Sequence, residues 1–296
     1  MAEMATSEEL MGPFAKGMMR SVTAIAPERE KELWEEIVQE DKWTFELTGG
    51  PAQYFADTGD HAVMASHAGL AALWCLAYVA FHTMDAALAA QHQHGGRHDS
   101  PANIDIGEHW RRLNLKSYLE YAERLMQEDE EWPAGLIKPN PRAPFDSIEG
   151  RINNAFLGAA AFILLHEVGH VYHRDVADNR IRKMQEERAD LFAARWIFDG
   201  AGAGLDREFR IVMVTIAILY LCQVERRYGM RATYPTAYER LSAAAQHFNA
   251  EPRSIGLMSA AAVLKAVLDP TSEATEAFTD AVAYFAWVRR RLQSAA

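Results

Sequence analysis

The chain has 296 residues, of which 49% are hydrophobic and 24% are charged, a composition typical of a folded globular protein. Its net charge of -11 argues against nucleic acid and anionic membranes as primary partners, because both attract basic surfaces. The two cysteines, Cys75 and Cys222, are too few for a disulfide framework, and the acidic N-terminus lacks a secretory signal, so we expect a cytoplasmic protein.

The predicted elements of the first half are mostly helices. Residues 27–41 begin with a proline and acidic side chains, as the first turn of a helix does. Residues 43–47 form the best candidate for a strand, which the Gly-Gly-Pro sequence at 49–51 would end. Residues 62–91 are predicted to form one long apolar helix, and a further helix is expected over residues 115–126.

Two stretches of the chain are apolar enough to be considered as membrane spans. Residues 68–81 and 211–222 are both shorter than the roughly 18 to 20 apolar residues that a span requires. We therefore expect buried core helices and no membrane partner.

The second half begins after an irregular connection. Residues 132–145 contain four prolines, which exclude a regular element. Asp146, with Glu149 three residues later, resembles a capping box and predicts a helix that runs to about His173. Further helices are predicted over residues 181–198, 206–227, 235–248, 254–268 and 273–292.

The most informative motif lies within the first of these helices. His166-Glu167-Val168-Gly169-His170 is an H-E-x-x-H pattern. Two histidines four residues apart project from the same face of a helix, so they can bind one zinc ion together. Glu167 lies beside them, where it can take a proton from a metal-bound water. The motif predicts a metal-dependent hydrolase, with a peptidase as the first hypothesis.

A catalytic zinc ion usually has three protein ligands and one position for water, so a third ligand is needed. Glu186 and Asp190 share one face of the next predicted helix. Glu186 would bind the metal, while Asp190 would accept a hydrogen bond from a ligating histidine and fix its tautomer. Glu187 competes with Glu186 for the ligand role, and Asp175 is a further candidate. The small Ala189 would allow the two helices to approach closely.

An H-E-x-x-H helix followed by a helix with E-x-x-A-D resembles the gluzincin metallopeptidases. The resemblance implies a zincin-like fold and one zinc ion per chain. It also assigns the site residues: His166, His170 and Glu186 as ligands, Glu167 as general base and Asp190 as the orienting acid.

More narrowly, the chain is similar to the Lit-like phage-exclusion peptidase family. The similarity lies in its length, its helix-rich sequence, the stretches Phe-Ile-Leu-Leu-His-Glu-Val-Gly-His and Glu-Glu-Arg-Ala-Asp-Leu-Phe-Ala, and Tyr234-Pro235 followed by Glu239-Arg240-Leu241. It implies a bacterial cytoplasmic peptidase that cleaves a host protein, with a translation factor as one possible substrate.

Three further residues near these motifs have alternative roles. Tyr172 and Tyr234 could each stabilise a tetrahedral oxyanion, although most tyrosines only pack. His173 could replace a ligand or assist the transition state, and a surface or supporting position is the alternative.

We therefore predict a mainly α, zincin-like, helix-rich single domain with at most a small β element near residues 43–48. An N-terminal helical region, residues 1–132, would pack on the same core as the metallopeptidase region, residues 133–296. The leading hypothesis is a zinc-dependent endopeptidase that acts on a cytosolic protein in phage defence. The alternatives are a zincin-fold sensor or regulator with little peptidase activity, and a helical scaffold with a chance motif. A di-iron bundle is disfavoured because the chain has no second E-x-x-H.

Overall fold

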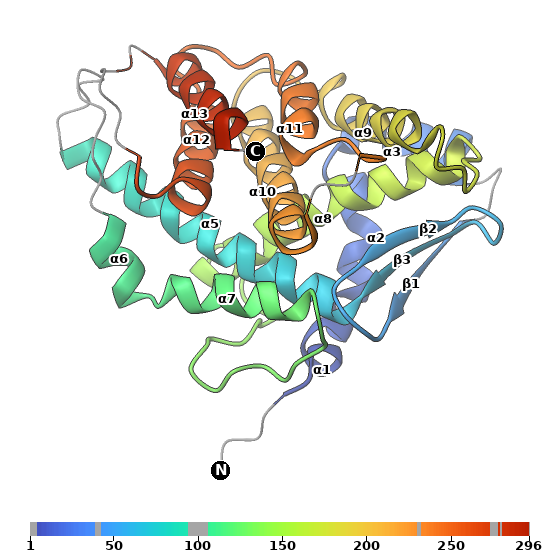
Figure 1. The fold of residues 1–296 in the computed structure, drawn as a ribbon, viewed down its shortest axis with the longest axis horizontal. Coiled ribbons are helices and arrows are strands. Elements are labelled where there is room, and N and C mark those ends of the chain that lie inside the picture. The colour runs from blue at the N-terminus through green and yellow to red at the C-terminus, as the bar shows by residue number, and fades with distance from the viewer. Residues whose placement is uncertain are drawn as a thin grey trace.

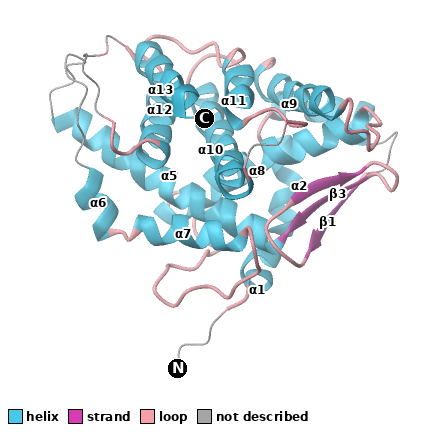
Figure 2. Ribbon diagram, in the orientation of Figure 1, coloured by secondary structure: helices cyan, strands magenta, loops and turns pink. Residues whose placement is uncertain are grey.

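Helices account for most of the chain, and a small three-stranded sheet lies at one side of the molecule (Figure 1). The computed structural model describes residues 5–38, 43–93, 106–229, 232–272, 278 and 280–295. The prediction of a mainly α fold with a small β element is confirmed (Figure 2).

The first half of the chain contains short helical turns, the sheet and then three helices. In chain order these are α1 (Ser7–Met11), η1 (Gly12–Phe14), α2 (Ala15–Ala24), η2 (Pro27–Arg29), α3 (Glu30–Glu32), the π-helical turn η3 (Leu33–Val38), β1 (Thr44–Thr48), β2 (Tyr54–Asp57), β3 (Ala62–Ser66), α5 (His67–Gln93), α6 (Ile106–Arg112) and α7 (Leu115–Leu125). Among the residues described, every regular element of the second half is a helix. Its elements are α8 (Ile148–Tyr172), α9 (Arg182–Phe198), α10 (Leu205–Tyr228), α11 (Ala237–Ala245), α12 (Ile255–Leu268) and α13 (Ala281–Ala295).

The sheet is larger than the single strand that the sequence predicted. β3 lies in the middle, parallel to β1 and antiparallel to β2, with Thr44 opposite Ala62 and Tyr54 opposite Ala65. The helix predicted from residue 62 is therefore wrong over its first five residues. Its apolar sequence fits a buried strand as well as a buried helix, and the two cannot be distinguished by periodicity alone. The hydroxyl of Ser66 accepts a hydrogen bond from the Gly69 amide at the start of α5.

Two other predicted helices differ from the structure. Over residues 27–38, the turns η2, α3 and η3 replace one continuous helix, and residues 39–42 of that prediction lie outside the described residues. At the C-terminus, α13 begins at Ala281, whereas 273–277 and 279 lie outside the described residues.

Helix α8 lies at the centre of the fold. Its N-cap is Ser147, whose hydroxyl accepts a hydrogen bond from the Gly150 amide, so the cap lies one residue after the predicted Asp146. The helix contacts α2, α5, α9, α10 and the sheet (Figure 1). The indole of Trp74 on α5 donates a hydrogen bond to the Asn153 side chain on α8 at 2.9 Å. One hydrophobic core includes residues of both halves, from Met11 to Val288.

By length and composition, α5 (over His67–Ala89) and α8 could cross a membrane. In the fold, 67% of the most apolar window of α5 and 89% of that of α8 are buried. Burial against other helices accounts for their apolar composition. For α5 this agrees with the core helix predicted over residues 68–81, although the helix is longer than that stretch.

Candidate metal centre

Small residues bring α8 and α9 together at the candidate site. A Cβ atom added at Gly169 would lie 3.2 Å from the Cα atom of Ala189, and Ala189 is fully buried. The expected role of Ala189 in a close helix contact is thus confirmed. This approach places Glu186, one turn earlier on α9, against the histidines of α8.

Gly169→Val should separate the two helices and weaken metal binding. The added side chain would meet the backbone of α9, and overpacking of this kind costs about 1–3 kcal/mol of stability. The zinc dissociation constant from a competition titration and the thermal midpoint would measure the two effects. Gly12→Val is the control, because a Cβ added there meets no atom within 4 Å from other parts of the described chain. Equal zinc binding by both variants would show that the helix contact does not position the site.

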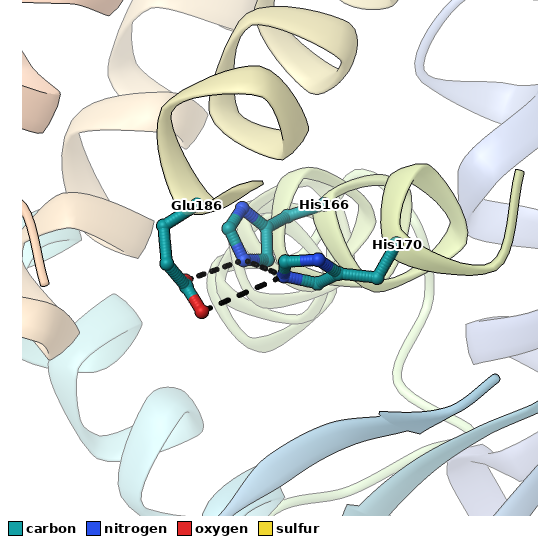
Figure 3. Close-up of side chains that lie close together, drawn as sticks. All are labelled: His166, His170 and Glu186. Carbon is teal, nitrogen blue, oxygen red and sulfur yellow. Dashed lines mark hydrogen bonds and ion pairs between the residues drawn. The ribbon is translucent and has the colours of Figure 1, made fainter. Parts of the chain in front are cut away.

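Three buried side chains converge between α8 and α9 (Figure 3). The Nε2 atoms of His166 and His170 are 3.1 Å apart. The Oε2 atom of Glu186 lies 3.3 Å from His166 Nε2, and its Oε1 atom lies 3.7 Å from His170 Nε2. The neighbouring Glu187 is exposed and takes no part in the cluster. The structure therefore brings together the three residues that the sequence proposed as ligands.

The other ring nitrogen of each histidine faces a carboxylate. His170 Nδ1 lies 2.8 Å from Asp175 Oδ2 in a buried hydrogen bond. His166 Nδ1 lies 2.8 Å from Asp190 Oδ1, which is within ion-pair distance. The angle between the two groups falls outside the range of a hydrogen bond. A carboxylate at Nδ1 favours the proton on that nitrogen and leaves the Nε2 lone pair for a cation.

Asp175 supports a histidine instead of being a separate ligand. It follows the end of α8, where Arg174 has a left-handed backbone with φ of 53°. The chain turns back there, and the Asp175 amide donates a hydrogen bond to the carbonyl of His170. Its position five residues after His170 was visible in the sequence, but its orientation depends on this turn.

The geometry and the donor set fit a zinc ion. Ligand atoms at about 2.0–2.2 Å from a tetrahedral zinc are roughly 3.3 Å from each other, close to the observed separations of 3.1 to 3.7 Å. Two Nε2 lone pairs facing each other at this distance also need a proton or a metal ion between them. Nitrogen and carboxylate donors are those that zinc prefers.

The electrostatics of the cluster favour a bound cation. Burial lowers the pKa of His166, but the carboxylates of Asp190, Glu186 and Glu167 outweigh it and raise the pKa to about 10. Burial raises the pKa of Glu186, but its contacts with His166 and His170 hold it well below the usual range. A metal ion would therefore have to displace a proton from His166.

A buried arginine that sequence reasoning missed holds two of the acids. Arg240 on α11 is 8% exposed, and its guanidinium donates to Glu186 Oε2 at 2.9 Å and to Asp190 Oδ1 at 2.8 Å. The only signal in the sequence was its place in Glu239-Arg240-Leu241, which carries no chemistry by itself. The arginine fixes the proposed third ligand and its supporting acid from a separate helix.

Asp190→Asn and Asp175→Asn should each weaken zinc binding by about 10- to 100-fold, as the loss of a carboxylate behind a ligating histidine does. Titration with a zinc chelator would measure the change. Asp178→Asn is the control, since that acid is paired with exposed Arg180. Unchanged affinity in both test variants would mean that neither carboxylate supports a ligand.

A cleft of about 650 Å³ opens beside the cluster. It is bordered by β2 and its flanking residues and by α8, α9, α10 and α11. The lining includes the three clustered side chains, Glu167 and Tyr234. Glu167 is 8% exposed, and burial raises the pKa of its carboxyl, with His166 and His170 opposing.

Tyr172 and His173 do not line this cleft. Tyr172 is 46% exposed and packs on Phe192, and both residues line a second cleft of about 330 Å³. Because α8 ends at Tyr172, the chain there has already passed the cluster. Of the three predicted accessory residues, only Tyr234 reaches the cleft of the cluster.

Comparisons with known proteins agree with a peptidase. Residues 63–262, which include the whole cluster, match the model of the family described as Peptidase U49. The chain is 25% identical over 229 residues to a protein of Escherichia coli (strain K12) named cell death peptidase, covering 73% of this chain and 74% of that protein. No solved structure matches the chain at a significant level.

Proposed function

The chain belongs to the peptidase U49 family, and we propose that it is a zinc-dependent endopeptidase. The observation that carries the proposal is the convergence of His166, His170 and Glu186, with Glu167 beside them in one cleft. His166, His170 and Glu186 would hold the metal. Zinc bound there would lower the pKa of a water molecule and polarise the scissile carbonyl.

Glu167 has the position and environment of a general base. It lies next to His166 on α8, so its place relative to the ligands is fixed by the helix. A raised pKa brings a carboxyl closer to neutral pH, where a base exchanges protons most effectively. Its carboxylate would take a proton from the attacking water and then pass it to the nitrogen of the leaving amine.

The strand that lines the cleft supports a peptide substrate. β2 pairs with β3 alone among the described residues, so one of its edges has no strand partner there. Residues Tyr54, Phe55 and Ala56 of this strand line the cleft. An extended peptide can add to such an edge through main-chain hydrogen bonds.

We propose a cytosolic host protein as the substrate. The relative's name, cell death peptidase, supports a target whose cleavage harms the cell. The resemblance to phage-exclusion peptidases makes a translation factor the first substrate to test. We propose that the protein acts in the bacterial cytoplasm as part of phage defence.

Metal analysis combined with fragment mapping tests the proposal. Purified protein should contain one zinc ion per chain. Cells that express the wild type should contain new protein N-termini that are absent with Glu167→Gln. Zinc without such fragments would favour a sensor or regulator, and protein that binds no zinc would favour a helical scaffold.

A further inference from the structure

Arg182 lies in the cleft, next to the cluster. It is the first residue of α9, four residues before Glu186, so the two side chains share one face of the helix. Arg182, Glu186 and the H-E-x-x-H residues all line the same cleft. Four residues of helix correspond to about 6 Å along the axis.

Arg182 differs from the other cations of this region because it has no carboxylate partner among the described residues. Arg240 binds Glu186 and Asp190. The neighbouring cations Arg188, Arg180 and Lys183 each contact a carboxylate, that of Asp175, Asp178 and Glu239 respectively.

The Arg182 side chain is also partly buried, and its guanidinium lies near the ring of Tyr234. Its Nε atom is buried and has no hydrogen-bond partner among the residues that the structure describes. Its guanidinium lies 5.8 Å from the centre of the Tyr234 ring, within the range of a cation–π contact. Tyr234 lines the cleft as well. The guanidinium of Arg182 can therefore donate hydrogen bonds to a ligand that binds in the cleft.

We propose that Arg182 is a specificity-determining residue that binds an acidic side chain of the substrate. The inference rests on the proposed peptidase function. A guanidinium presents a planar fork of donors that matches a carboxylate. Since 6 Å corresponds to about two residues of extended peptide, the acid should lie within about three residues of the cleaved bond. The structure thus favours an acidic residue near the cleavage site although the protein itself carries a net charge of -11.

Cleavage profiling with charge reversal tests this inference. Zinc-loaded protein would be incubated with a peptide library prepared from a whole proteome, and the cleavage sites would be mapped. The wild type should enrich Glu or Asp at one position within three residues of the cut. For matched peptides with Glu or Gln there, kcat/KM should differ by at least about tenfold, mainly through KM.

The variants separate a charge contact from a structural role. Arg182→Gln should remove the acid preference, Arg182→Lys should retain part of it, and Arg182→Glu should replace it by a preference for Lys or Arg. Arg180→Glu is the matched control, because Arg180 is an exposed residue two positions earlier, and its profile should equal that of the wild type. An unchanged profile in Arg182→Glu, or equal slowing of all peptides, would overturn the inference.

A binding measurement keeps this test distinct from that of the proposed function. On a Glu167→Gln background, the same Glu and Gln peptides would be compared by fluorescence anisotropy. Tighter binding of the Glu peptide that is lost in Arg182→Gln supports the inference without turnover. Equal binding of both peptides contradicts it. Metal-dependent cleavage without an acid preference would overturn only the role of Arg182.

Discussion

Glu167→Gln is expected to lower the rate of peptide hydrolysis by about a thousandfold, the usual contribution of a positioned general base. Glutamine has nearly the same size but cannot accept a proton at the position of the carboxylate. The three side chains of the cluster are not changed, so zinc content should stay at the wild-type level. The rate constant measured with zinc-loaded protein at equal metal content would show the effect.

Folding should survive this substitution. Burial already disfavours the charged form of Glu167, so a neutral side chain there removes a desolvation penalty. The thermal midpoint should therefore equal or exceed that of the wild type. A variant that keeps more than a tenth of the activity would rule out Glu167 as the base.

Glu186→Gln should abolish stoichiometric zinc binding and, with it, hydrolysis. The amide is a weaker and uncharged ligand. The substitution also removes one of the two carboxylates that Arg240 contacts among the described residues and leaves Asp190. We expect the zinc dissociation constant to rise by more than about 100-fold. Loss of a carboxylate behind a ligating histidine, by comparison, raises it by about 10- to 100-fold. Mass-spectrometric metal analysis after dialysis would measure the loss.

Glu187→Gln is the matched control for the third ligand. Glu187 is adjacent on the same helix but exposed, so this variant should bind zinc as the wild type does. The reverse pattern, with zinc lost only in Glu187→Gln, would assign the ligand role to that residue. If both variants retained zinc, neither glutamate would be the third ligand.

Local patterns were sufficient for much of the helical fold. The helices predicted over residues 115–126, 181–198, 206–227, 235–248 and 254–268 agree with α7, α9, α10, α11 and α12 to within three residues at each end. These helices are predictable because their hydrophobic periodicity and their caps depend only on residues of the same helix. β3 was mistaken for helix because its neighbours in the sheet are strands elsewhere in the chain, which periodicity does not detect.

The core of the candidate site was likewise determined by the sequence. Helical geometry alone places His166 and His170 on one face, and the same spacing links Glu186 with Asp190. The small Gly169 and Ala189 allow the two helices to meet, as the observed contact shows.

Only the tertiary structure decided which other side chains belong to the site. Arg240 reaches Asp190 across 50 residues of sequence, because α11 packs on α9. The turn at Arg174 makes Asp175 a partner of His170, and the end of α8 carries Tyr172 away from the cleft. Helical spacing fixes neighbours within one element, whereas contacts between elements depend on how their buried faces pack.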